Sequence, residues 1–157
     1  MKIFYSDSPL DLDTNRHSIF LAGPTPRSLK VKSWRPEAIE ILESLNYKGQ
    51  VIVPERAIKA EHIDYDAQVE WENYGTENCT SLLFWVPRDL ETMPAFTTNV
   101  EFGRYVESGK AFYGRPDNSP KNRYLDWLYS KFNTNRVINN NLKDLIENAI
   151  GQELFYI

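Results

Sequence analysis

The sequence predicts an α/β fold in which a doubly wound, five-stranded parallel sheet carries helices on both faces. Three observations lead to this prediction. Short apolar runs typical of buried strands alternate with segments whose apolar residues recur at helical spacing. No long linker, repeat or low-complexity tract interrupts the alternation. The chain of 157 residues, 41% hydrophobic and 25% charged, suits a single domain spanning residues 1–157, with 1–17 as an N-terminal extension.

The expected strands are short and apolar on both faces, as in a parallel sheet that is covered on both sides. The strand patterns occupy residues 18–22, 50–53, 82–86, 110–114 and 136–138. Lys2–Tyr5 is a further candidate for a short edge strand. Crossover connections between parallel strands are right-handed, and the flavodoxin-like order 2-1-3-4-5 is the topology that we expect.

The expected helices lie between these strands. Apolar residues at i, i+3, i+4 and i+7 predict helices that begin near Ser33, span residues 119–132 and cover Leu142–Ile150. A helix is also expected over residues 64–78, and another is expected to begin near Thr98. Residues 153–157 form an apolar tail that should pack against a groove or a partner, which favours a homo-oligomer.

Composition argues against several classes of function. The formal net charge of −4 argues against a broad nucleic-acid-binding face, and no apolar run approaches the length of a membrane span. Cys79 is the single cysteine, so no intrachain disulfide is possible and a reducing compartment, the cytoplasm, is expected. With isolated His17 and His62 beside one cysteine, we expect no metal site, and no motif indicates a cofactor.

The predicted topology brings two loops together. In open α/β sheets, ligands bind beyond the carboxyl ends of the strands, where the strand order reverses. Residues 23–28 and 87–98 would share that crevice, which would collect Arg27, Ser28, Asn99 and Glu101. The crevice lacks a glycine-rich dinucleotide motif, a Walker loop and a Ser/His/Asp set, so carboxylate chemistry is what remains. A carboxylate can attack the anomeric carbon of a sugar and form a glycosyl ester.

Two interpretations of Glu101 stay open on local sequence. Thr98 and Glu101 fit a capping box, in which the two side chains satisfy backbone amides at a helix N-terminus. Alternatively, Glu101 is catalytic, and its position near a helix N-terminus should then keep it ionised at neutral pH.

The helix over residues 64–78 also allows two interpretations. One face carries polar and aromatic residues, namely Asp64, Gln68, Trp71, Glu72 and Gly75. This face is either a solvated surface or a wall of the ligand site, to which Asp66, Gln68 or Glu72 would contribute.

Several blocks together resemble the nucleoside 2-deoxyribosyltransferase family, in particular its bacterial and phage branch. They are IFLAGPTPR at 19–27, SWRPEA at 33–38, VPE at 53–55, QVEWE at 68–72, LFWVPR at 83–88 and FTTNVEFG at 96–103. The resemblance implies a flavodoxin-like fold and cleavage of the N-glycosidic bond of 2'-deoxynucleosides. It implies that Glu101 is the nucleophile and that Gly23, Pro24 and Arg27 lie against the base and sugar.

The resemblance also implies an acid on the helix over residues 64–78 that holds the base or the sugar. The candidates are Gln68, Glu70 and Glu72, with Trp71 and Asn99 as further contacts. Family members form oligomers in which a neighbour completes the site. The sequence departs from the better-known branch at Arg88-Asp89-Leu90 and at Thr97-Thr98, where an Asp-rich pattern is usual, so the exact substrate stays open.

We therefore expect a transferase that moves deoxyribose from one base to another by way of Glu101. A hydrolase of deoxynucleosides or of their 5'-phosphates, to which Arg27 could bind, is the alternative enzyme. A nucleotide-binding sensor without turnover is the alternative outside enzymes. The expected partner in each case is a small deoxynucleoside or deoxynucleotide.

Overall fold

The computed structural model describes residues 1–28, 30–58 and 64–151. Its sheet has five parallel strands in the order β1-β3-β2-β4-β5. The strands are β1 (Lys2–Tyr5), β2 (Ser18–Ala22), β3 (Gln50–Val53), β4 (Ser81–Trp85) and β5 (Ala111–Gly114). The predicted α/β class and the parallel five-stranded sheet are confirmed.

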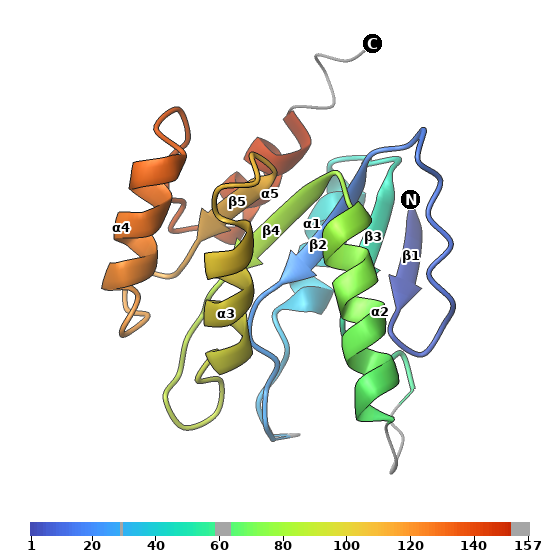
Figure 1. The fold of residues 1–157 in the computed structure, drawn as a ribbon, viewed down its shortest axis with the longest axis horizontal. Helices are drawn as coiled ribbons and strands as arrows, with labels where there is room; N and C mark the ends of the chain where they lie inside the picture. The colour runs from blue at the N-terminus through green and yellow to red at the C-terminus, as the bar shows by residue number, and fades with distance from the viewer. Residues whose placement is uncertain (29, 59–63, 152–157) are drawn as a thin grey trace.

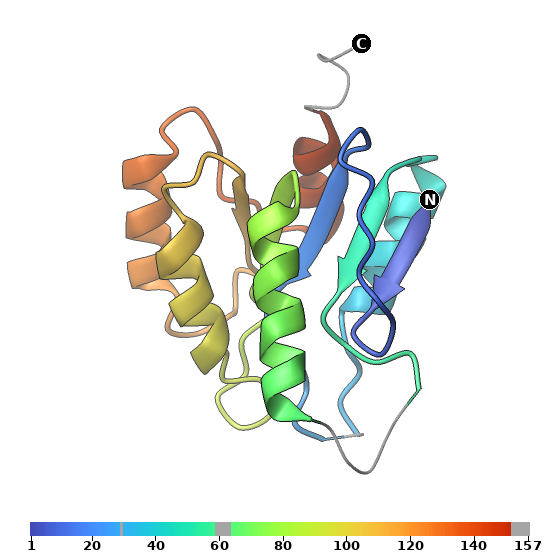
Figure 2. The same ribbon diagram turned by 45° about the vertical axis from the view of Figure 1, so that its right-hand side comes forward.

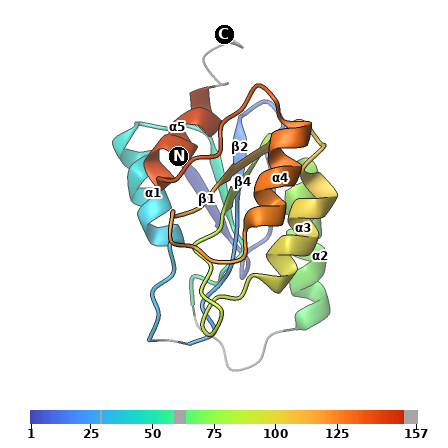
Figure 3. The same cartoon turned by 90° about the vertical axis from the view of Figure 1, so that its left-hand side faces the viewer.

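Helices cover both faces of the sheet (Figures 1 and 3). Two of them, α1 (Arg35–Ser44) and α5 (Leu142–Ile150), pack on one face. The other face carries α2 (Tyr65–Asn78), α3 (Phe96–Tyr105) and α4 (Arg123–Phe132). None of the helices in the described part of the chain is long and apolar enough to cross a membrane.

Alternation along the strands builds a core on each side of the sheet. In β2, Ile19 and Leu21 join the cluster under α1 and α5, whereas Phe20 and Ala22 join the cluster on the other face. Every residue of β2 is buried, as expected for a central strand of a parallel sheet. This rigid centre fixes the carboxyl ends of β2 and β4, from which the loops of the site begin.

The prediction of a fifth strand at residues 136–138 was wrong. Only an isolated parallel bridge joins Gly114 to Asn139 there, and Val137 is 65% exposed. Arg136 instead donates hydrogen bonds to the carbonyl oxygens of Ala111 and Gly109, so its side chain ties this segment to β5 without a ladder. A segment this short, with an exposed centre, buries too little apolar surface to hold a strand.

The candidate strand at the N-terminus takes the fifth place. β1 pairs with β3 at the opposite edge of the sheet, as Figure 2 shows, with Phe4 beside Ile52. The other four strands keep the expected relative order, because residues 50–53, 18–22, 81–85 and 111–114 follow one another across the sheet. The helix predicted over 119–132 begins only at Arg123. The tail at residues 153–157 lies outside the described residues.

Candidate active site

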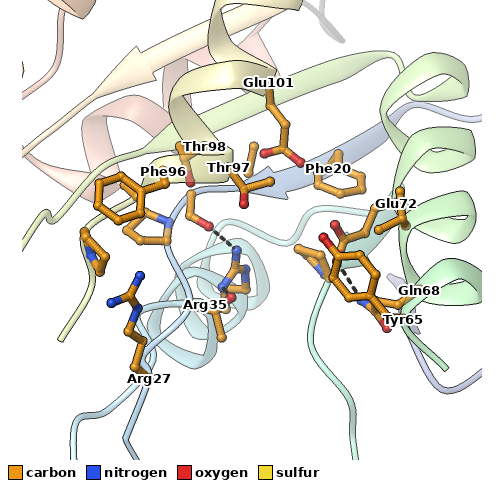
Figure 4. Close-up of a pocket in the computed structure, with 18 residues that line it drawn as sticks. Phe20, Arg27, Arg35, Tyr65, Gln68, Glu72, Phe96, Thr97, Thr98 and Glu101 are labelled. Atoms are coloured by element: carbon orange, nitrogen blue, oxygen red, sulfur yellow. Dashed lines mark hydrogen bonds between the residues drawn. The ribbon is translucent and has the colours of Figure 1, made fainter. Parts of the chain in front are cut away.

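A pocket of about 350 Å³ opens beyond the carboxyl ends of β2, β3 and β4 (Figure 4). Its wall comes from the loops after these strands and from the N-terminal parts of α1, α2 and α3. It is lined by Phe20, Ala22, Gly23, Pro24, Thr25, Arg27, Arg35, Pro54, Tyr65, Gln68, Val69, Glu72, Pro94, Ala95, Phe96, Thr97, Thr98 and Glu101. This is the place where the order of the strands reverses, and the predicted crevice lies there.

The loop after β2 requires glycine at its first position. Gly23 has a φ of 149°, and a Cβ at this position would lie 2.2 Å from the carbonyl oxygen of Trp85. The indole Nε1 of Trp34 donates to the carbonyl of Pro24 at 3.1 Å, which fixes the next residue. Gly23 and Pro24 therefore bring bare backbone to the pocket wall.

The two predicted loops do share one crevice. The backbone N–H of Arg27 donates to the carbonyl of Thr92 at 2.9 Å, and the Arg27 guanidinium lies 5.5 Å from the centre of the Phe96 ring. Arg27 is exposed, and in the described part of the chain it forms no ion pair. It therefore places an unpaired positive charge at the pocket.

The capping-box interpretation of Glu101 was wrong. Helix α3 begins at Phe96, ahead of Thr98, and its N-cap is Ala95 in the left-handed region at φ 61° without a side-chain cap. Thr98 is thus inside the first turn, where it is buried and lines the pocket, and Glu101 falls in the second turn. A carboxylate in the second turn is too far along the helix to cap its first amides.

Arg88 fastens the start of α3 to its neighbours. Its guanidinium donates to the carbonyl of Pro94 and, at 2.6 Å, to Oδ1 of Asn99, while its Nε donates to Asn122 at 3.1 Å. The start of α3 is thereby tied to β4 and to α4. This tether fixes the angle at which α3 presents Glu101 to the pocket.

Two carboxylates face the pocket from different helices. In Figure 4, Glu101 points into the pocket from α3, whereas Glu72 projects from α2 on the other side. Burial and the neighbouring charge of Glu72 raise the pKa of Glu101 to about 7, and the charge of Arg35 offsets part of the rise. This shift runs against the expectation that Glu101 is kept ionised at neutral pH by its place near a helix N-terminus, because burial raises its pKa toward neutrality.

Burial also raises the pKa of Glu72. Two interactions act in the opposite direction: Nε2 of Gln68 donates a hydrogen bond of 2.6 Å to the Glu72 carboxylate, and Arg35 attracts its charge. Burial raises the pKa of both groups, and two negative charges in one pocket repel one another, so the two carboxyl groups titrate as a coupled pair. Such a pair can supply a base or nucleophile and an acid in the same pocket.

The residues of the polar and aromatic face predicted on α2 have different neighbours in the structure. Gln68 and Glu72 line the pocket. Trp71 lies outside the pocket lining and donates its indole N–H to the carbonyl of Ser8 at 2.9 Å. It is held there because the N-terminal segment packs beside α2, so the predicted substrate contact at Trp71 does not belong to this pocket. Asp64 caps the helix by accepting from the N–H of Ala67.

The remaining predicted contacts also lie away from the pocket lining. Asn99 was predicted to contact the substrate, but it lies outside the pocket lining. Its side-chain oxygen accepts a hydrogen bond from Arg88 instead. Ser28 accepts a hydrogen bond from the N–H of Lys30. Asp66 and Glu70 are exposed on α2 outside the lining, so Glu72 is the acid of this helix that faces the pocket.

Sequence reasoning missed Arg35, which is buried in the pocket wall. A signal existed, because Arg35, Ala38 and Leu42 follow one another at i, i+3 and i+7 on the face of α1 that packs against the sheet. Tyr65 and Phe96, which add aromatic rings to the lining, carry no comparable signal.

Comparison with known proteins agrees with this geometry. A family model described as "Nucleoside 2-deoxyribosyltransferase like" matches residues 16–118, a stretch that contains β2 to β5, the whole pocket lining and both carboxylates. No curated protein matches the chain. From the match over most of its length, the chain belongs to the nucleoside 2-deoxyribosyltransferase-like family.

Proposed function

We propose that the protein is an enzyme that cleaves the N-glycosidic bond of a 2'-deoxynucleoside and passes the deoxyribose to another base. The observation that carries the proposal is the pair of carboxylates, Glu72 and Glu101, on two walls of one pocket in a chain of this family. A pocket of about 350 Å³ is within the size range of small-molecule sites.

In the first step, an ionised carboxylate oxygen of Glu101 forms a bond to C1' of the sugar. The bond from C1' to the base nitrogen breaks, and its electron pair leaves with the base. The proton that neutralises the departing base comes from Glu72, in the state of the pair in which its single proton lies on Glu72 and Glu101 is ionised. The products are a free base and a deoxyribosyl ester of Glu101.

In the second step, the nitrogen of an incoming base attacks C1' and the Glu101 carboxylate departs. The proton lost by the incoming base returns to Glu72, so the pair regains its starting state. Two displacements at C1' retain the configuration of the sugar. With water in place of the second base, the same ester gives hydrolysis, which is the alternative reaction.

Other residues of the pocket suit a nucleoside. The aromatic rings of Tyr65 and Phe96 are 75% and 68% exposed at the pocket, where a planar base can stack on them. The backbone at Gly23 and Pro24 permits close approach of the sugar. Arg27 can bind an anionic group, which favours a substrate that carries a 5'-phosphate.

The test is product analysis with purified protein. A 2'-deoxynucleoside and its 5'-phosphate are each incubated with and without a second base, and the products are separated by chromatography. Transfer gives a new nucleoside only when the second base is present, and hydrolysis gives free base and free sugar in either case. Binding of substrate without any product would reject both enzymes in favour of a sensor.

A matched pair of variants assigns the nucleophile. Glu101→Gln should bind substrate while turnover falls by about three orders of magnitude or more, because the attacking charge is lost. Glu107→Gln, an exposed acid just beyond α3, serves as the control and should keep full activity. Full activity in Glu101→Gln would place the nucleophile elsewhere.

A further inference from the structure

Arg35 is a buried cation in the wall of the pocket. It is the first residue of α1 and is 1% exposed, and its side chain makes four hydrogen bonds to its surroundings. Its Nε donates to the carbonyl of Leu21 at 3.0 Å, and its Nη2 donates to the carbonyl of Gly23 at 2.7 Å. Its Nη1 donates to Oγ1 of Thr25 at 3.0 Å and to Oε1 of Glu55 at 2.6 Å.

These bonds shape the loop that forms the pocket wall after β2. Three of the four acceptors, at Leu21, Gly23 and Thr25, lie in β2 or in the loop that follows it. A planar guanidinium with several donors can hold such a set at once, whereas a lysine ammonium has its donors on a single nitrogen. Arg35 therefore determines where the backbone at Gly23 and Thr25 meets a ligand.

Burying the charge of Arg35 costs desolvation free energy, and anchoring the loop does not by itself require a charged side chain. A buried ion pair gains little over apolar residues that fill the same space. Glu55 is the ion-pair partner of Arg35 in the described structure, and the ring of Trp34 covers the guanidinium at 4.9 Å. The guanidinium also borders the pocket that contains Glu72 and Glu101.

Three carboxylates from three elements act on this single cation. Glu55 follows β3, Glu72 lies on α2 and Glu101 lies on α3, and each attracts the Arg35 charge. In return, Arg35 lowers the pKa of Glu72 and that of Glu101, against the rise that burial causes in both. Without this cation, two half-buried carboxylates would border the same pocket, and the hydrogen bond from Gln68 would offset the charge of Glu72 alone.

We propose that Arg35 is a positioning residue of this site, whose guanidinium holds loop 23–25 in the shape that receives the sugar and whose charge allows Glu72 and Glu101 to occupy one pocket. The electrostatic part concerns the protein without substrate. The part that concerns turnover rests on the proposed glycosidic function.

The electrostatic part is tested by titrating the glutamate carboxyl groups by ¹³C NMR in the substrate-free protein, with Glu101→Gln used to assign the Glu101 signal. Arg35→Gln removes the charge and should raise the midpoint of Glu101 by about one pH unit. Arg35→Lys keeps the charge and should leave the midpoint within about half a unit. Arg104→Gln is the control, because Arg104 lies on α3 but pairs with Glu77 at the surface, and it should change nothing.

The positioning part is tested by kinetics. Arg35→Lys should raise KM about tenfold and change kcat about threefold or less, because the loop loses its anchor while the charge remains. Arg35→Gln should lose activity at pH 7 and recover part of kcat at pH 9, where Glu101 becomes ionised again.

The outcomes separate cleanly. If folded Arg35→Gln leaves the Glu101 midpoint unchanged, or if Arg35→Lys raises it by a full unit, the electrostatic role is rejected. If Arg35→Lys keeps the wild-type KM, the positioning role is rejected. Should Arg35→Gln fail to fold, the KM of Arg35→Lys still decides the positioning part, and a rise of a full unit in the Glu101 midpoint of Arg35→Lys still rejects the electrostatic part. A protein without any glycosidic activity would reject the proposed function while the titration result for Arg35 still stands.

Discussion

Glu72 on α2 and Glu101 on α3 border the same pocket, and neither forms an ion pair in the described part of the chain. Their mutual repulsion adds to burial and raises the pKa of Glu101 to about 7, well above the range of an ordinary glutamate. Perturbed carboxyl groups in a concave site are typical of catalytic pairs. The pH dependence of activity and of stability therefore tests the roles of Glu72 and Glu101.

Activity should rise with pH through about 7, because Glu101 has to be ionised to attack C1'. Glu72→Gln should move this rise to lower pH, since removing the Glu72 charge removes a repulsion that opposes ionisation of Glu101. It should also lower kcat, by about tenfold to a hundredfold, through loss of the acid. The measurement is kcat/KM between pH 5 and 9.

The matched control for this prediction is Glu70→Gln, an exposed acid on the same helix that lies outside the pocket lining. It should reproduce the wild-type profile. A wild-type profile that is flat from pH 5 to 8 would contradict a role for ionised Glu101 with this pKa.

Glu101→Gln should stabilise the folded protein at pH 8. The pKa of Glu101 is raised from 4.5 to about 7 in the folded protein, so folding binds a proton between these values and stability falls as pH rises through them. The ionised side chain then costs about 1–3 kcal/mol above pH 7, a cost that glutamine lacks. Urea denaturation at pH 4.5 and pH 8 measures the difference.

The gain in Glu101→Gln should be present at pH 8 and largely absent at pH 4.5, where wild-type Glu101 is protonated in the folded protein and about half protonated in the unfolded chain. Equal stability changes at the two pH values would mean that Glu101 titrates as an ordinary exposed glutamate.

Gly23→Ala should destabilise the protein by about 3 kcal/mol or more, because a methyl group would collide with the Trp85 carbonyl in a backbone conformation that alanine avoids. Gly103→Ala is the opposite case. Gly103 lies within α3, and a Cβ there meets nothing within 4 Å. Alanine should stabilise the helix at this position by about 0.5–1 kcal/mol. Thermal unfolding compares the two variants, and a Gly23→Ala protein as stable as wild type would contradict the geometry of this loop.

Arg27→Ala should raise KM for a deoxynucleoside 5'-phosphate about tenfold and leave KM for the unphosphorylated nucleoside within about threefold. The reason is that Arg27 lines the pocket with its charge free of any ion pair in the described structure. Lys30→Ala removes a cation outside the pocket lining and serves as the control. An equal rise in KM for both substrates would assign Arg27 to the base or sugar and not to a phosphate.

Much of the fold could be predicted because it rests on local patterns. The apolar run of β2 and the helical spacing of apolar residues in α5 follow from which residues must be buried, and both elements match the expected ranges. Residues 136–138 show the limit of this reasoning. Two β-branched residues, Val137 and Ile138, are compatible with a strand beside β5, but tertiary contacts decided the outcome: Arg136 bonds through its side chain, and the segment pairs with β5 only at an isolated bridge.

The candidate site shows the same division. The loops at residues 23–28 and 87–98 were predicted to meet, since parallel strands that end at one edge bring their loops together. The start of α3 was not predictable from Thr98 and Glu101 alone, because the Arg88 tether and the turn at Ala95 begin the helix earlier. Trp71 shares a helical face with Glu72, but its indole N–H donates a hydrogen bond to Ser8 in the N-terminal segment.

The sequence by itself determined the α/β class, the meeting of the two loops and the family blocks that single out Glu101, since these depend on residue order and on burial at regular spacing. The tertiary structure alone decided that Glu72 faces Glu101 and that Arg35 lies in the wall beside them. The physical reason is that a pKa depends on charges and burial contributed by several elements, which are distant along the chain and become neighbours only when the sheet is complete.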